Sequence, residues 1–107
     1  MNVAANLPWS EQFRVVAKQW CDAEAAASLL EDTKSAVLSQ KMAALGESKV
    51  NKAEMTVKAS PEWSDHIAKT IAARKHANLL KVQMEYLRMK FQEWNSEAAT
   101  RRAEMKL

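Results

Sequence analysis

Basic residues recur at heptad spacing along the second half of the chain. Arg74, Lys81, Arg88 and Arg102 are separated by one or two heptads, which places them on one ridge of a helix. The strip is widened toward the C-terminus by Lys75, Lys90, Arg101 and Lys106. Because aromatic residues lie nearby at Tyr86, Phe91 and Trp94, this surface suits phosphate contact with some base stacking. The alternative interpretation, which charge alone favours, is a solvated charged face whose residues pair with acids, some of them on neighbouring subunits.

The charge is distributed unevenly along the chain. Residues 1–46 contain four Lys or Arg against five Asp or Glu, whereas residues 47–107 contain twelve against eight. A near-neutral half followed by a basic half favours an anionic partner for the second half.

Other residue types that could do chemistry are isolated. Cys21 is the only cysteine, which excludes an intramolecular disulfide or a cysteine-based zinc site, and we expect it to be half-buried. His66 and His76 are ten residues apart and do not share a helix face. The chain has no phosphate-binding glycine loop, HExxH motif or nucleophile elbow. We therefore expect no enzyme activity, no cofactor, no metal and no small-molecule substrate.

Two long helices must position these residues. One Gly and two Pro in 107 residues leave room for few chain reversals. The first helix is predicted over 8–46, from Pro8 to the stop signal Gly46. The second is predicted over 61–106, because Ser60-Pro61-Glu62 supplies an N-cap, a proline at the first position and an early acid.

Each predicted helix has an apolar seam with alternating steps of three and four. Folding one seam onto the other in antiparallel fashion pairs residues whose numbers add to 107: Phe13 with Trp94, Val16 with Phe91, Trp20 with Leu87, Ala23 with Met84, Ala27 with Leu80, Leu30 with Ala77 and Ala44 with Trp63. The fold class is therefore an all-α, coiled-coil-like antiparallel hairpin, one domain over 1–107. This register places Trp94 in the core and predicts flanking ion pairs Lys81–Glu24 and Arg74–Glu31.

The connector over 47–59 has two interpretations. Alternation from Lys52 to Ala59 is typical of a short strand, whose partner would come from another subunit. Asn51 followed by Glu54 is equally consistent with the capped start of a short helix.

The second helix has more apolar surface than one partner helix can cover. The additional residues are Ile71, Leu79, Val82, Tyr86 and Met89, and the first helix adds Leu38, Met42 and Leu45 off its seam. Helices that are apolar on two sides are buried on two sides, so we expect a homo-oligomer, either a helical bundle or a ring.

Nothing in the sequence indicates a membrane protein. Met1 to Leu7 has neither a basic nor an apolar leader region, and no run approaches the roughly 20 apolar residues of a membrane span. We expect a soluble protein in the cytoplasm.

The layout resembles the UvsY-type recombination mediators of tailed phages. The similarity covers about residues 40–105 and is carried by the connector Lys52-Ala53-Glu54-Met55-Thr56-Val57 before a long helix and by Arg101-Arg102 near its end. It implies a ring-like oligomer in the host cytoplasm that binds single-stranded DNA. It also implies that the protein helps to load a RecA-like recombinase onto strands coated by single-strand-binding protein. The chain is shorter than those mediators, with a reduced N-terminal part.

Two classes of function therefore remain. The first is an oligomeric accessory protein of recombination or replication that binds single-stranded nucleic acid. The second is a helical protein–protein adaptor or inhibitor that binds no nucleic acid and docks through its second apolar stripe.

Overall fold

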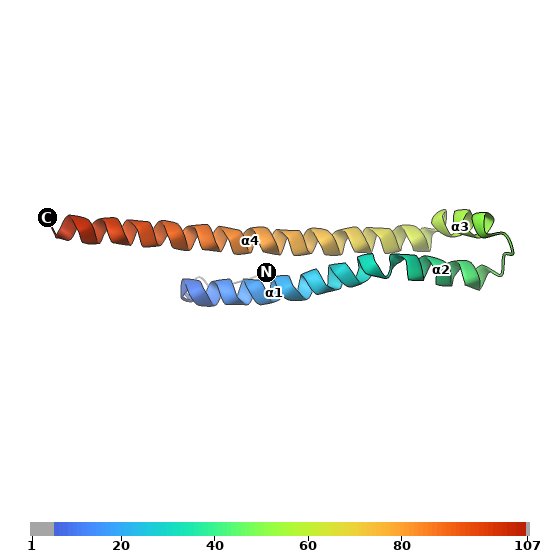
Figure 1. Ribbon diagram of the computed structural model, residues 1–107, viewed down its shortest axis with the longest axis horizontal. Helices are drawn as coiled ribbons and strands as arrows, with labels where there is room; N and C mark the ends of the chain where they lie inside the picture. Colours follow the sequence, from blue (N-terminus) through green and yellow to red (C-terminus); the bar gives the residue numbers. More distant parts are fainter. Residues whose placement is uncertain (1–5, 107) are drawn as a thin grey trace. The chain divides into compact units, whose positions relative to one another are not determined.

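The computed structural model describes residues 6–106 and contains four helices there, with no strand in that range. They are α1 (Trp9–Asp32), α2 (Lys34–Leu45), α3 (Val50–Lys58) and α4 (Pro61–Met105) (Figure 1). Helix is the only regular secondary structure over these residues, which confirms the predicted all-α fold class. Most of the N-terminal segment inspected for a leader, Met1 to Ala5, lies outside the described residues.

The predicted helix ends are confirmed where the sequence has strong signals. Gly46 follows α2 in the left-handed conformation with φ 68°, and its N–H donates to the Ala43 carbonyl. A glycine adopts this conformation without the steric cost that a Cβ brings. Before α4, the Ser60 Oγ accepts a hydrogen bond from the Trp63 N–H at 3.2 Å, as an N-cap should.

The predicted single helix over 8–46 is interrupted at Thr33, between α1 and α2. The Thr33 hydroxyl donates to the Leu29 carbonyl at 2.6 Å, a local bond that competes with the helix ladder and bends helices. The backbone bond from the Val37 N–H to the Thr33 carbonyl is kept at 2.9 Å. The interruption is therefore a local distortion with no chain reversal.

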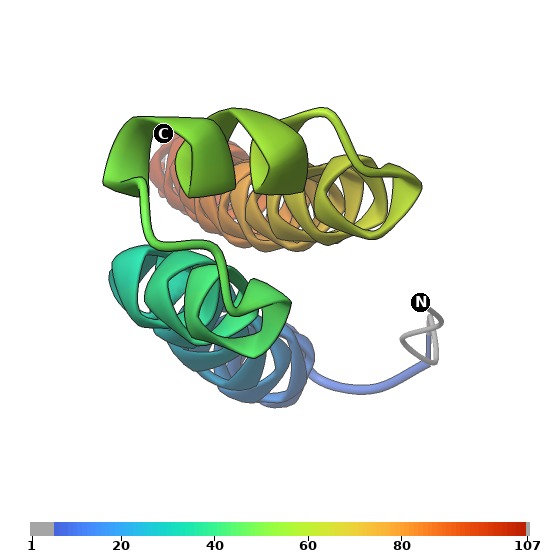
Figure 2. The same ribbon diagram turned by 90° about the vertical axis from the view of Figure 1, so that its right-hand side faces the viewer.

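The connector is a helix, so its interpretation as a strand is wrong. α3 buries Ala53 and Val57, four residues apart on one face, and it packs against α2 (Figure 2). The expected capping residue Asn51 lies inside the helix, and Lys49 occupies the N-cap position without a side-chain cap. Ala44, which was predicted to be a seam residue facing Trp63, is exposed.

The chain divides into two compact units. One comprises Ala23–Ala77, and its buried apolar residues are Ala27, Ala53, Val57, Trp63 and Ala77. The other comprises Met1–Asp22 with Asn78–Leu107, and its buried apolar residues are Val16, Leu80 and Leu87. All but the α3 residues belong to the predicted seams, so these seam residues are confirmed as buried, whereas the seam residues Ala44, Phe91 and Trp94 are exposed.

The register within the second of these units differs from the predicted one. Phe13 lines a hollow with Leu87 and Phe91 and lies under the Arg88 guanidinium, so it is one to two turns away from Trp94. Trp94 is 48% exposed, and its predicted place in the core opposite Phe13 is wrong. Periodicity alone could not decide this, because sliding two heptad seams by a helical turn keeps apolar residues in contact.

Candidate nucleic-acid interface

The basic ridge of α4 begins with a residue that is already engaged. Arg74 donates to Glu31 at 2.7 and 2.9 Å and to Glu24 at 2.6 Å, and its side chain is 28% exposed. The Arg74–Glu31 pair is thus confirmed, whereas Glu24, predicted to pair with Lys81, accepts its bond from Arg74. These hydrogen bonds lower the pKa of Glu31 and raise that of Arg74. We exclude Arg74 from the candidate interface, since phosphate would have to displace two carboxylates.

Further along the helix the ridge emerges into solvent. Lys81, Arg88 and Arg102 are all exposed, although they occupy the same heptad position as Arg74. A straight helix drifts by about 20° per heptad relative to a 3.5-residue repeat, so a fixed heptad position rotates away from the seam. The half-buried residues Gln83 and Lys90, on the other flank of the seam, fit this direction of drift.

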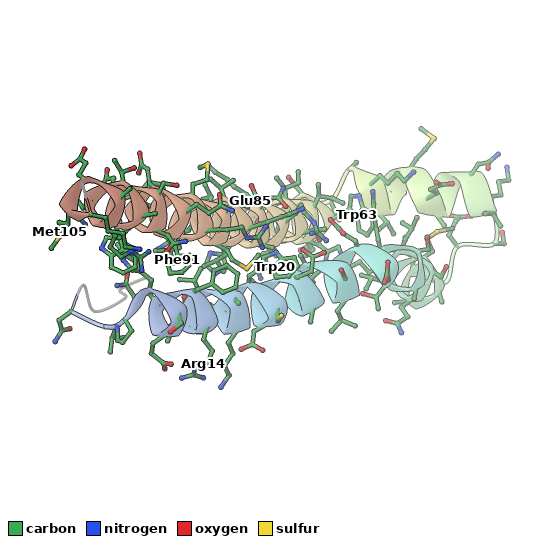
Figure 3. All side chains as sticks on the ribbon, turned by 60° about the vertical axis from the view of Figure 1, so that its left-hand side comes forward. Arg14, Trp20, Trp63, Glu85, Phe91 and Met105 are labelled. Carbon is green, nitrogen blue, oxygen red and sulfur yellow. The ribbon has the colours of Figure 1, made fainter. Side chains whose placement is uncertain are left out.

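Aromatic residues and one arginine form a hollow at this end of the hairpin. Trp9, Ser10 and Phe13 of α1 and Leu87, Arg88 and Phe91 of α4 line a space of about 300 Å³. The Arg88 guanidinium carbon lies 5.7 Å from the centre of the Phe13 ring, within the range of a cation–π contact. In Figure 3 Phe91 lies on the side of α4 that faces α1. The hollow therefore combines flat apolar walls with a positive charge at its edge.

The aromatic surface continues along α4 beyond this hollow. The Phe91 and Trp94 rings are stacked with centroids 6.2 Å apart, and they are 44% and 48% exposed. Both continue the seam, so Arg88 and Arg102 flank them on one side and Lys90 on the other. Exposed aromatic rings with cations on both sides are the arrangement that binds single strands, with bases on the rings and phosphates on the charges.

The end of α4 is exposed almost throughout. Arg101, Arg102 and Lys106 are exposed, and among residues 95–106 only Ala98 is half-buried. Arg101 shares a hollow of about 360 Å³ with Glu97 and Glu104, which offset its charge locally. Arg102 and Lys106 are thus the stronger phosphate candidates at this end. Lys75 is exposed in the other unit, on a different face of α4.

The residues predicted to form an oligomer interface are all exposed in the single chain. Their exposed fractions are 63% for Ile71, 58% for Leu79, 61% for Val82, 52% for Tyr86 and 60% for Met89. The Lys90 ammonium lies 6.0 Å from the Tyr86 ring centre. On α2, Leu38 and Met42 are half-buried and Leu45 is 47% exposed. The apolar residues that lie off the seam of the first helix are therefore partly covered within the chain.

The reasoning from sequence missed the contribution of α1. Trp9 was assigned to no site, and Phe13 and Trp94 were treated as core. A signal was available, since the first helix starts near residue 8 and leaves the last seam residues of α4 without a partner helix. Cys21, expected to be half-buried, is exposed.

Other chemistry finds no support in the described residues. Over 6–106 no group of three or more His, Cys, Asp or Glu side chains is arranged to hold a metal ion. His66 is half-buried, and its ring centre lies 5.5 Å from that of Trp63. Among the helices of this range, none is both long and apolar enough to cross a membrane. Comparison of the chain with protein-family models, with curated proteins and with solved structures finds no match in any of the three.

Proposed function

We propose that the C-terminal part of α4 and the start of α1 bind single-stranded nucleic acid without sequence specificity. The observation that carries the proposal is the exposed pair of stacked rings, Phe91 and Trp94, flanked by Arg88, Lys90 and Arg102. A helix bundle has little reason to leave two aromatic rings in water, whereas a single strand offers bases for them to stack on.

The dimensions fit a short stretch of nucleic acid. From Arg88 to Arg102 the helix rises by about 21 Å at 1.5 Å per residue. With the 3.4 Å rise of a stacked strand, this corresponds to about six nucleotides. The cations would contact phosphates and the aromatic rings would contact the faces of the bases. Every nucleotide has both groups, so this binding would not depend on sequence.

The resemblance to UvsY-type mediators adds a specific role to this proposal. In that role the chain is an oligomer that binds single-stranded DNA and helps a RecA-like recombinase to replace single-strand-binding protein. The recombinase and single-strand-binding protein are partners suggested by the resemblance, while the DNA contact is supported by the aromatic and basic residues themselves.

The experiment is fluorescence anisotropy of a labelled single-stranded oligonucleotide over a range of salt concentrations. The cations at this end of α4 are Arg88, Lys90, Arg101, Arg102 and Lys106. If all five contact phosphate, the logarithm of the association constant should fall linearly with the logarithm of the salt concentration, with a slope of about −3.5. The double variant Arg102→Glu with Lys106→Glu should flatten this slope by about 1.4. The matched control is Lys18→Glu with Lys34→Glu, two exposed lysines elsewhere on the hairpin that give the same change in net charge.

The aromatic contribution is tested separately. Phe91→Ala with Trp94→Ala should weaken binding by about 1–3 kcal/mol per stacked base and leave the salt slope unchanged. Absence of binding by the wild-type protein at about 50 mM salt, where electrostatic affinity is strong, would contradict the proposal. So would an equal loss in the lysine control.

A protein–protein adaptor is the second candidate, favoured by the exposed apolar residues Leu79, Val82, Tyr86 and Met89 of α4. In that case Val82→Asp or Tyr86→Asp should abolish partner binding, and the charge variants should retain it.

A further inference from the structure

Four large apolar residues of α4 form a stripe on the side away from the hairpin seam. Leu79, Val82, Tyr86 and Met89 are each more than half exposed, while Leu80 and Leu87 on the seam are buried. Their spacing of three, four and three residues is that of a second coiled-coil seam. We define the outer face as this stripe together with Lys75 and Glu93, which continue it at either end.

The outer face is symmetric about its centre. Read from either end, the stripe has the same spacing, and its midpoint lies between Val82 and Tyr86. Lys75 stands four residues before Leu79, and Glu93 stands four residues after Met89. The face is therefore symmetric in its spacing, and its two ends have opposite charges.

We propose that the outer face of α4 binds the same face of a second copy of this chain, antiparallel and around a two-fold axis. In this register Val82 packs on Tyr86 of the second copy and Leu79 on Met89. Each Lys75 then lies against Glu93 of the second copy, which gives two opposite-charge contacts, one at each end.

Charge decides between the two orientations. A parallel pair would place Lys75 beside Lys75 of the second copy and Glu93 beside Glu93. Each of these two contacts brings like charges together, and this repulsion disfavours the parallel orientation. An antiparallel pair shifted by one heptad would leave Lys75 against Tyr86 and lose the apolar layers at the ends. A two-fold pair requires a surface that complements itself, and the opposite charges of Lys75 and Glu93 at the two ends of the face meet this requirement.

Residues beyond the charged ends are compatible with this pairing. The next positions on the face are Ala72 and Ser96, and in the antiparallel register these small side chains meet each other. The helices can therefore remain close past the ion pairs. The interface lies on the opposite side of α4 from the stacked rings Phe91 and Trp94, so it goes beyond the proposed nucleic-acid site and does not depend on it.

The register also places one unfavourable contact near the two-fold axis. Glu85 flanks the stripe one residue before Tyr86, and it points away from the seam in Figure 3. In the antiparallel pair it comes beside Glu85 of the second copy. Removing this repulsion with Glu85→Gln should tighten the dimer, an outcome that simple apolar association does not predict.

The test is sedimentation equilibrium of the full chain without nucleic acid, with a charge-swap cycle. Lys75→Glu and Glu93→Lys, each alone, should raise the dimer dissociation constant by about ten-fold, because each replaces two attractive contacts by two repulsive ones. The double swap should restore a dissociation constant close to that of the wild type. Lys81→Glu, an exposed lysine off the outer face, is the control for net charge and should have little effect.

Three outcomes would overturn the proposal. A wild-type chain that stays monomeric at every concentration excludes the dimer. A double swap that is as weak as the single swaps excludes the antiparallel register. A trimer or larger ring that is unaffected by Tyr86→Asp excludes this face as the contact. Circular dichroism of each variant, expected to match the wild type because all these sites are exposed, separates loss of association from loss of folding.

Discussion

Two adjacent leucines on α4 provide a direct test of which face of the helix is buried. Leu80 is 2% exposed and belongs to the seam, whereas Leu79 is 58% exposed on the outer face. Leu80→Ala and Leu79→Ala remove the same atoms from neighbouring positions of one helix. Differences in helix propensity and composition between the two variants therefore cancel.

The expected magnitudes differ by several kcal/mol. Leu80 is among the largest fully buried side chains, so its truncation should lower the free energy of unfolding by about 2–5 kcal/mol through lost burial and a residual cavity. Leu79→Ala should change it by no more than about 0.5 kcal/mol in the monomer. For a domain of this size the Leu80 variant should lose at least about 10 °C in Tm.

The assay is urea unfolding followed by far-ultraviolet circular dichroism, at the lowest protein concentration that gives a signal. Low concentration removes any contribution of the second copy to Leu79. At high concentration Leu79→Ala should weaken dimerisation, whereas Leu80→Ala should not. Equal unfolding energies for the two variants at low concentration would refute the assignment of faces on which both proposals depend.

Two further predictions concern the turn and the ion pairs. Gly46→Ala should destabilise the hairpin by about 1–2 kcal/mol in the same urea assay, because φ is 68° there and an L residue is strained in this left-handed conformation. Nothing lies within 4 Å of the added Cβ, so the backbone strain is the whole expected effect. An unchanged urea midpoint would mean that this end of α2 is not held in the left-handed conformation. Glu31→Gln should lower stability at neutral pH, since Arg74 holds the pKa of Glu31 below its ordinary 4.5 and such a carboxylate stabilises the fold above that value. The difference from the wild type should shrink as the pH falls below 4.5, and a difference that is constant with pH would contradict the ion pair.

Local chemistry made several features predictable from the sequence. Gly46 and the Ser60-Pro61 pair mark helix ends because their backbone preferences and hydrogen bonds are properties of a few neighbouring residues. The buried seam residues Val16, Leu80 and Leu87 follow from periodicity, which depends only on residue spacing. The Arg74–Glu31 pair was also predictable, because long charged side chains reach across a change of register.

The candidate site depended on information that periodicity does not contain. Heptad spacing defines a stripe but not the offset between two stripes, and it does not include the drift of a straight helix relative to its repeat. The sequence alone therefore placed Trp94 in the core and could not choose between strand and helix for the connector. The packing of α1 on α4 decided that Phe13 meets Phe91 and that Trp94 is left in water.

What the sequence determined by itself was the two long helical stretches, the helix ends at Gly46 and Ser60-Pro61, and the two apolar faces of α4, because each of these arises from neighbours along the chain. Only the tertiary structure decided which of these faces of α4 is buried within the chain, and at which residue of α4 the contact with α1 ends. That depends on contacts between residues far apart in sequence. The start of α1 leaves the last aromatic and basic residues of α4 exposed, and the proposed nucleic-acid interface lies there.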